Sequence, residues 1–219
     1  MNTQKDYLKA MGIEVWQEKK TKVASEPQET LIASEEVIDW DSLRNKVAAC
    51  TACELCKTRT NVVFGVGNTN ADVMFVGEAP GETEDLKGEP FVGRAGMLLN
   101  EMMRSIGLER DTVYIANILK CRPPRNRDPL PTEVDLCTPN LKQQIVFIKP
   151  KVIIAVGRIA AHFLLNTDES MGKLRGKQYS YGDLNTPLFV IYHPAYLLRS
   201  PREKSKAYED LKHIASQIK

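Results

Sequence analysis

Four short apolar segments that alternate with helical patterns constrain the fold of this chain most strongly. The apolar segments are residues 72–77, 112–119, 151–157 and 188–192. The helical patterns run over residues 95–106, 131–148, 158–165 and 201–218. Strands that are apolar throughout and alternate with helices are typical of a parallel sheet covered on both faces. The sequence therefore predicts an α/β fold, a three-layer α/β/α sandwich with a central four-stranded parallel sheet.

The first 38 residues differ in character from the rest. Residues 1–17 carry apolar side chains at near-helical spacing, which predicts an N-terminal helix. Residues 18–38 are rich in Glu, Lys, Ser and Thr, which predicts a flexible linker. The main domain then spans residues 39–219, and one interpretation of the N-terminal helix is a docking element for a protein partner.

Composition excludes several classes of protein. The chain has 219 residues, of which 42% are hydrophobic and 26% charged, as in globular proteins. Its apolar runs are far shorter than the roughly 20 residues of a membrane span, and its N-terminus has no apolar signal segment. We expect a cytoplasmic monomer with no membrane partner.

The charge is unevenly distributed along the chain. Residues 120–219 contain 17 basic and 9 acidic side chains, whereas the whole chain has a net charge of only +2. A basic C-terminal half suits an anionic partner such as nucleic acid. A solvated lysine surface is the alternative.

Polar or glycine-rich residues follow each predicted strand. Residues 77–81 follow the first strand, Asn117 lies late in the second, Arg158 follows the third, and His193 follows the fourth. Ligands of parallel sheets bind beyond the carboxyl ends of the strands. We therefore expect these four segments to converge on one pocket.

The five cysteines form the most compact motif. Cys50, Cys53 and Cys56 lie within seven residues, and Cys121 and Cys137 follow later. In a cytoplasmic chain such cysteines indicate a zinc site or an iron–sulfur cluster, although some could be buried thiols. The spacing leaves open which metal binds and which four cysteines hold it.

Two side chains suit a planar ligand. Phe91 precedes a glycine-rich turn and could stack on a ring or fill the core. Asn117 lies within an apolar strand, where its amide could read an imide edge by donating and accepting at once, or could tie down a loop. The acidic loop 77–85 lacks the Gly-Lys-Ser/Thr ending of a phosphate-binding loop.

Two further segments suit a DNA backbone or a base stack. Residues 120–129 carry four cations, among them Arg122, Arg125 and Arg127, on a proline-stiffened loop that suits phosphates. Residues 197 and 198 are leucines that could wedge into a base stack or could head a helix.

Together these motifs closely resemble the family-4 uracil-DNA glycosylases, which are iron–sulfur members of the uracil-DNA glycosylase superfamily. The residues that carry the resemblance are Gly77-Glu78-Ala79-Pro80-Gly81, Phe91-Val92-Gly93, Asn117, Lys120-Cys121-Arg122-Pro123-Pro124, His193-Pro194-Ala195 and Leu197-Leu198-Arg199. The resemblance covers about four-fifths of the chain, from residue 41 onward. It implies an enzyme that flips deoxyuridine out of DNA, hydrolyses its N-glycosidic bond and so starts base excision repair.

The resemblance also implies the ligands of a structural [4Fe–4S] cluster. These fall on Cys50, Cys53, Cys121 and Cys137. Cys56 is then the spare cysteine, since the family pattern does not require one there.

By the same resemblance, the uracil pocket falls on six residues: Gly77, Glu78, Ala79, Phe91, Asn117 and His193. Phe91 would stack on the uracil, and Asn117 would read its N3–H and O4 edge. His193 would donate to O2 as negative charge develops there. Leu197 or Leu198 would fill the vacated stack, and Arg199 would hold a phosphate.

The water-activating residue is the uncertain part of the resemblance. Superfamily members with a Gly-Gln-Asp-Pro motif have an Asp near the attacking water, where this chain has Ala79. Glu84 is the favoured substitute, with Glu78 and Asn126 as alternatives; a further alternative is that attack on the oxocarbenium needs little help.

Two other functions compete with the glycosylase. The first is a non-catalytic or covalent uracil-DNA binder on the same fold, but the loop of residues 122–127 contains no histidine to trap DNA. The second is a redox or regulatory iron–sulfur protein, which leaves Phe91, Asn117 and His193 unexplained.

Overall fold

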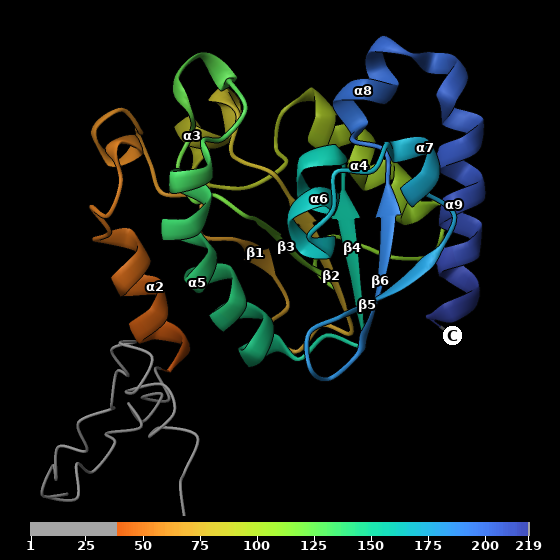
Figure 1. Cartoon of the computed structure of the whole chain (residues 1–219), viewed down its shortest axis with the longest axis horizontal. Coiled ribbons are helices and arrows are strands. Elements are labelled where there is room, and N and C mark those ends of the chain that lie inside the picture. Colours follow the sequence, from red (N-terminus) through yellow and green to blue (C-terminus); the bar gives the residue numbers. More distant parts are fainter. Residues whose placement is uncertain (1–38, 219) are drawn as a thin grey trace, which may run out of the picture. The chain divides into compact units, whose positions relative to one another are not determined.

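A computed structural model describes residues 39–218 (Figure 1). The N-terminal helix expected at residues 1–17 and the linker expected at residues 18–38 lie outside the described residues. None of the described helices is both long and apolar enough to cross a membrane.

The centre of the fold is a six-stranded sheet with the order β1-β3-β2-β4-β6-β5. Its strands are β1 (Val66–Gly67), β2 (Val73–Gly77), β3 (Tyr114–Asn117), β4 (Val152–Val156), β5 (Gln178–Tyr181) and β6 (Thr186–Ile191). Strands β3, β2, β4 and β6 are parallel, which confirms the predicted central four-stranded parallel sheet. Strands β1 and β5 add antiparallel edges that the sequence did not predict.

The unpredicted edge strands lack the apolar pattern of the central four. β1 has only two residues, and β5 has the sequence Gln-Tyr-Ser-Tyr with alternate residues exposed. By contrast, every residue of β2, β3 and β4 is buried. An edge strand needs only one covered side, so its sequence carries a weaker signal.

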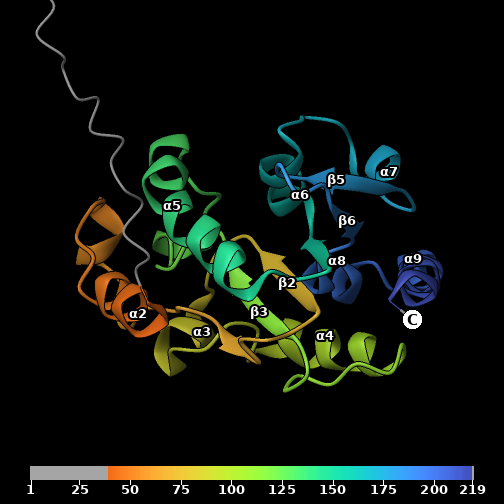
Figure 2. The same cartoon turned by 90° about the horizontal axis from the view of Figure 1, so that it is seen from below.

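Helices cover both faces of this sheet, as expected for a three-layer sandwich. The helices are α2 (Trp40–Ala48), α3 (Glu82–Lys87), α4 (Arg94–Arg104), α5 (Pro131–Ile148), α6 (Arg158–Leu165), α7 (Met171–Leu174), α8 (Pro194–Arg199) and α9 (Lys204–Gln217), with short 3-10 turns at Glu54–Lys57, Pro124–Asn126 and Pro201–Glu203. Figure 2 shows α5 and α6 on the side of the sheet opposite α4.

Successive residues of the central strands enter two separate cores because side chains alternate across a sheet. Met74 and Val76 of β2 pack with residues of α5 and α6. Val73 and Phe75 of the same strand pack with residues of α4 and α9. Burial of both faces is the reason that these strands are apolar throughout.

A small aromatic cluster attaches α2 to this framework. Asp39 caps the helix by accepting hydrogen bonds from the backbone N–H groups of Asp41 and Ser42. The ring of Trp40 lies 5.3 Å from that of Phe64 and 5.8 Å from that of Phe147 on α5, both edge to face. This packing joins the first turn of α2 to the last turn of α5, and the cysteine segment follows the other end of α2.

The carboxyl ends of the four parallel strands lie at one edge of the sheet. Gly77 pairs in register with Asn117 at the ends of β2 and β3. Val156 of β4 pairs with Ile191 of β6. The loops that follow these strands therefore start side by side.

Candidate active site

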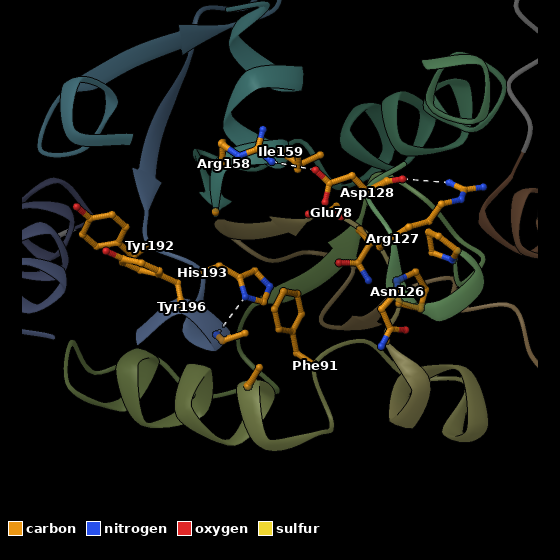
Figure 3. Close-up of a pocket in the computed structure, with 18 of the residues that line it drawn as sticks. Glu78, Phe91, Asn126, Arg127, Asp128, Arg158, Ile159, Tyr192, His193 and Tyr196 are labelled. Atoms are coloured by element: carbon orange, nitrogen blue, oxygen red, sulfur yellow. Dashed lines mark hydrogen bonds and ion pairs between the residues drawn. The ribbon is translucent and has the colours of Figure 1, made fainter. Parts of the chain in front are cut away.

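A cavity of about 840 Å³ opens at this edge of the sheet. Its lining includes Glu78 after β2, Asn117 of β3, Arg158 after β4 and His193 after β6 (Figure 3). The predicted convergence of the four segments is therefore confirmed. The cavity is the natural place to look for chemistry.

Asn117 contributes an unpartnered polar group to the cavity. The residue is only 2% exposed, and its Oδ1 has no hydrogen-bond partner among residues 39–218. A buried amide oxygen without a partner is costly unless a ligand completes it. Asn117 therefore has the character of a ligand-binding group.

Gly77 is required by this arrangement. A Cβ atom at position 77 would lie 2.4 Å from Asn117 Oδ1 and 2.6 Å from the ring of Phe91. Any side chain there would push the amide and the ring out of place. The glycine thus contributes by leaving space rather than by making a contact.

Phe91 is held in an unusual backbone conformation beside the cavity. Its φ is +51°, a region that bulky residues rarely adopt. Arg110 donates to the carbonyl oxygens of Phe91 and Pro90 at 3.2 and 2.5 Å. Arg110 therefore anchors the segment through the backbone of Phe91 and Pro90.

Glu84 is a second side chain that anchors the segment containing Phe91. Its Oε1 accepts hydrogen bonds from the backbone N–H groups of Val92 and Gly93 at 3.0 and 2.8 Å. The side chain also borders the cavity. Its position is compatible with orienting a water molecule, but it has a clear structural contact as well.

The ring of His193 lies beside that of Phe91, with centroids 5.8 Å apart, and both rings line the cavity. Its Nδ1 accepts a hydrogen bond from the backbone N–H of Ala195 at 3.1 Å. Burial, reinforced by the charge of Arg199, lowers the pKa of His193 from 6.5 to about 4, although Glu84 opposes the shift. The imidazole is therefore neutral near pH 7 and carries its proton on Nε2, where it can donate.

The pKa of Glu78 is shifted upward, in contrast to that of His193. Its pKa is raised from 4.5 to about 7, mainly by burial and also by the charge of the nearby Asp128, while Arg158 opposes the rise. Arg158 itself donates to Asp128 at 2.9 Å. A carboxyl group with a pKa close to neutrality in a cavity is a candidate for proton transfer.

The predicted DNA-binding arginines differ in whether they already have a partner within the protein. Arg122 donates to Asn126 at 2.7 Å, and Arg127 forms an ion pair with Glu133 at 2.6 Å. Arg125 and Arg199 are exposed, and neither has an ion pair within the described part of the chain. These two arginines are therefore the freest to meet phosphates.

The structure corrects one half of the leucine prediction. Leu197 is 1% exposed and packs in the core between the sheet, α4 and α9, so it is not available to DNA. Leu198 is 37% exposed. Adjacent residues of α8 point in different directions, and only the second leucine faces outward.

All five cysteines line a second, small cavity between α2 and α5. Arg59 donates to Cys121 Sγ at 3.0 Å, and the backbone N–H of Lys120 donates to Cys137 Sγ at 3.4 Å. Within residues 39–218, no group of three or more His, Cys, Asp or Glu side chains is close enough to hold a single metal ion.

The cysteines that line this cavity come from three separate segments of the chain: Cys50 to Cys56, Cys121 and Cys137. A [4Fe–4S] cluster binds each cysteine through a different iron, so its sulfur ligands stand farther apart than those of one zinc ion. The small pocket collects cysteines from segments far apart in the sequence, with N–H donors to two of the sulfurs. Thiol groups of this number are the ligands that a zinc site or an iron–sulfur cluster requires.

Several residues of the site were not found from the sequence. Arg110 and Asp128 act through contacts with Phe91 and Arg158, and no local pattern distinguishes them from surface charges. Arg158 itself is expected at the cavity from its place after the third strand, but its ion pair with Asp128 is not. Tyr192 and Tyr196 also line the cavity, although their positions beside His193 could have drawn attention to them.

The cavity at this edge of the parallel sheet combines a buried amide, an aromatic ring and a neutral histidine, which are groups suited to a planar polar ligand. A family model for the uracil DNA glycosylase superfamily matches residues 64–212. The chain belongs to this superfamily, as the resemblance in its motifs indicated.

Individual relatives narrow the similarity to one type within the superfamily. The chain is 48% identical over 181 residues to the type-4 uracil-DNA glycosylase of Archaeoglobus fulgidus, covering 80% of this chain and 90% of that protein. It is 46% identical over 179 residues to the type-4 enzyme of Thermotoga maritima, covering 80% and 92%. A type-5 uracil-DNA glycosylase of Pyrobaculum aerophilum is 33% identical over 150 residues, covering 60% and 64%.

Proposed function

We propose that this protein is a DNA glycosylase that flips deoxyuridine out of DNA and hydrolyses its N-glycosidic bond, releasing uracil and starting base excision repair. The observation that carries the proposal is the unpartnered Oδ1 of Asn117 beside Phe91. Similarity to type-4 uracil-DNA glycosylases over 80% of the chain supports it.

Recognition of the base follows from the hydrogen-bonding capacity of uracil. Phe91 stacks on the flipped ring, while Asn117 Oδ1 accepts from N3–H and the amide nitrogen donates to O4. Cytosine presents an amino donor in place of O4 and an unprotonated N3. An amide that keeps this orientation loses both bonds to cytosine and is left unpaired, so cytosine is rejected.

Catalysis depends on stabilising the departing base. The N-glycosidic bond breaks to give an oxocarbenium-like sugar and a uracil anion. The protonated Nε2 of His193 donates to uracil O2 as charge develops there, and the backbone at Glu78 and Ala79 lines the same side. Such preorganised donors are worth most in a site that excludes water.

Water activation is assigned to Glu84, with Glu78 as the second carboxylate and Asn126 as an alternative. All three border the cavity. Glu78 has the pKa near 7 that suits proton transfer, and Glu84 lies closer in sequence to the stacking segment. Ala79, where some superfamily members have an Asp, can do no proton chemistry.

We assign the DNA surface to residues that line the cavity or follow its lining in the chain. Leu198 fills the space that the flipped nucleotide leaves in the stack. Arg199 holds a phosphate of the same strand, and Arg125, with Arg122 and Arg127, meets more distant phosphates. Base-independent contacts of this kind position the strand without reading its sequence.

We further propose that Cys50, Cys53, Cys121 and Cys137 hold a [4Fe–4S] cluster, with Cys56 as the spare cysteine. The cluster would link the N-terminal end of the domain to the loop of residues 120–127 and supply no chemistry to the reaction. Arg59 and the backbone of Lys120 would donate to its sulfur ligands.

A glycosylase assay tests the proposal directly. A labelled oligonucleotide with one uracil is incubated with the protein, treated with alkali and separated on a denaturing gel, beside a thymine control. We expect cleavage at uracil only. If protein with its cluster intact releases no uracil, the proposal is wrong, and a gel shift that survives denaturation would indicate covalent capture instead.

A further inference from the structure

The cavity has a second aromatic wall that base excision, as proposed above, leaves unused. Tyr192 and Tyr196 both line it, and their ring centroids are 5.1 Å apart with the planes tilted by 44°. In Figure 3 the two rings lie on one side of His193 and Phe91 lies on the other. A uracil stacked on Phe91 would leave the tyrosines uncovered.

The size of the cavity exceeds what one pyrimidine needs. Its volume is about 840 Å³. Pockets of roughly 300–1,000 Å³ hold whole drug-sized ligands. A flipped uracil therefore leaves enough space for part of a neighbouring nucleotide.

The ring of Tyr192 is held in place by a neighbouring cation. The guanidinium of Arg175 lies 5.5 Å from the ring centroid of Tyr192. Asp210 in turn fixes Arg175 through two hydrogen bonds of 2.9 Å. A cation over the face of a ring is attracted to it and so stabilises the position of Tyr192.

Tyr196 and Arg199 bring this wall to the surface. Tyr196 is 36% exposed, and Arg199 lies three residues further along α8 and lines the same cavity. Arg199 forms no ion pair with any other residue that the structure describes. An aromatic stacking surface next to a free cation is the combination by which proteins bind single-stranded DNA.

We propose that Tyr192 and Tyr196 form a subsite for the unpaired base that flanks deoxyuridine in single-stranded DNA, with Arg199 on the phosphate between the two nucleotides. This inference rests on the proposed glycosylase function. In a duplex the flanking base stays paired and stacked on its own neighbours. The subsite therefore serves uracil in single strands more than uracil in duplexes.

The test removes the flanking base rather than the protein contact alone. Single-stranded oligonucleotides carry one uracil with both neighbours intact, or with a stable abasic analogue on the 5′ or the 3′ side. Steady-state kcat and KM are measured for the wild type, Tyr196→Ala and Tyr196→Phe. Tyr208→Ala is the matched control, because Tyr208 is 50% exposed on α9 and does not line the cavity.

We expect the KM of the wild type to rise about tenfold when the base on one side is missing, which corresponds to the loss of one stacked base. The KM of Tyr196→Ala should be raised by the same factor on the intact strand and should rise no further on that abasic strand. Tyr196→Phe and Tyr208→Ala should resemble the wild type. On duplex substrates Tyr196→Ala should have little effect.

Three results would overturn the subsite. One is a wild type that responds to neither abasic substitution. Another is a Tyr196→Ala variant whose KM rises equally on intact and abasic strands, which would indicate a backbone contact. The third is an equal effect on duplex substrates. Each of these leaves uracil release intact, whereas a wild type that releases no uracil from any substrate contradicts the glycosylase proposal instead.

Discussion

The backbone N–H of Ala195 donates to Nδ1 of His193 at 3.1 Å, and this bond determines which imidazole nitrogen can donate. Because Nδ1 is an acceptor, the neutral ring carries its proton on Nε2. The pKa of His193, lowered mainly by burial to about 4, keeps the ring neutral over the physiological range. A neutral donor stabilises a developing anion without first having to bind a proton from solution.

The first prediction concerns the pH dependence of this donor. We expect His193→Ala to lower the single-turnover rate of uracil release by about 10- to 1,000-fold, the scale of losing one charge-stabilising donor. The ratio of wild-type to variant rates should stay constant from about pH 8 down to about pH 5, because His193 does not titrate there. A ratio that grows as the pH falls through 6.5 would show instead that the histidine acts as a cation.

The second prediction separates two roles of Glu84. Its Oε1 holds the backbone N–H groups of Val92 and Gly93. Glu84→Gln retains an oxygen that can accept from those groups but loses the negative charge, whereas Glu84→Ala loses both. If Glu84 orients the attacking water, both variants should have reduced single-turnover rates while still binding uracil-containing DNA.

The comparison of the two Glu84 variants decides the assignment. An unchanged rate in Glu84→Ala would remove Glu84 from the reaction altogether. A normal rate in Glu84→Gln with a reduced rate in Glu84→Ala would reduce its role to holding the Phe91 segment.

The third prediction links Glu78 to stability. Its pKa is raised from 4.5 to about 7 in the folded protein, so the folded state binds more protons than the unfolded state between these two pH values. Stability should therefore fall as the pH rises through this window. Glu78→Gln cannot ionise, and it should gain in melting temperature over the wild type as the pH rises from about 5 to about 8.

Thermal unfolding at both pH values checks this expectation. The difference between variant and wild type should be larger at the higher pH. An equal difference at both would mean that the Glu78 carboxyl titrates near its ordinary pKa in the folded protein.

The fourth prediction concerns the anchoring of Phe91. Arg110 donates to the carbonyl oxygens of Phe91 and Pro90, and hydrogen bonds of this kind contribute about 1 kcal/mol each. We expect Arg110→Gln to raise KM for a uracil-containing oligonucleotide by about 5- to 10-fold through a misplaced stacking ring. Arg104→Gln is the control, since Arg104 is exposed on α4 and pairs with Glu101 and Glu109. Equal KM values for both variants would show that Phe91 keeps its position without Arg110.

The fifth prediction tests the cluster ligands one by one. Serine variants of Cys50, Cys53, Cys121 and Cys137 should lose iron content and the visible absorbance of a [4Fe–4S] cluster. Cys56→Ser should retain both and is the matched control, since Cys56 lines the same small cavity. Loss of iron from Cys56→Ser with full retention in any of the other four would reassign the ligand set.

The central sheet and the location of the site could both be predicted from the pattern of residues along the chain. Continuous apolar strands can be satisfied only where both faces are covered, so the parallel sheet followed from β2, β3, β4 and β6. Because their carboxyl ends must share one edge, Asn117 and His193 had to meet there. The motifs around these residues also carried enough information to indicate the superfamily.

Which side chains are exposed to a ligand depends on packing between segments that are distant in the chain. Leu197 and Leu198 are adjacent and chemically identical, yet the first is buried and the second exposed, because only packing of α8 on α4 and the sheet selects between them. Arg110 and Asp128 acquire their roles from partners far along the chain. The sequence shows which groups are present, but contacts between distant segments set their partners, their burial and hence their pKa values.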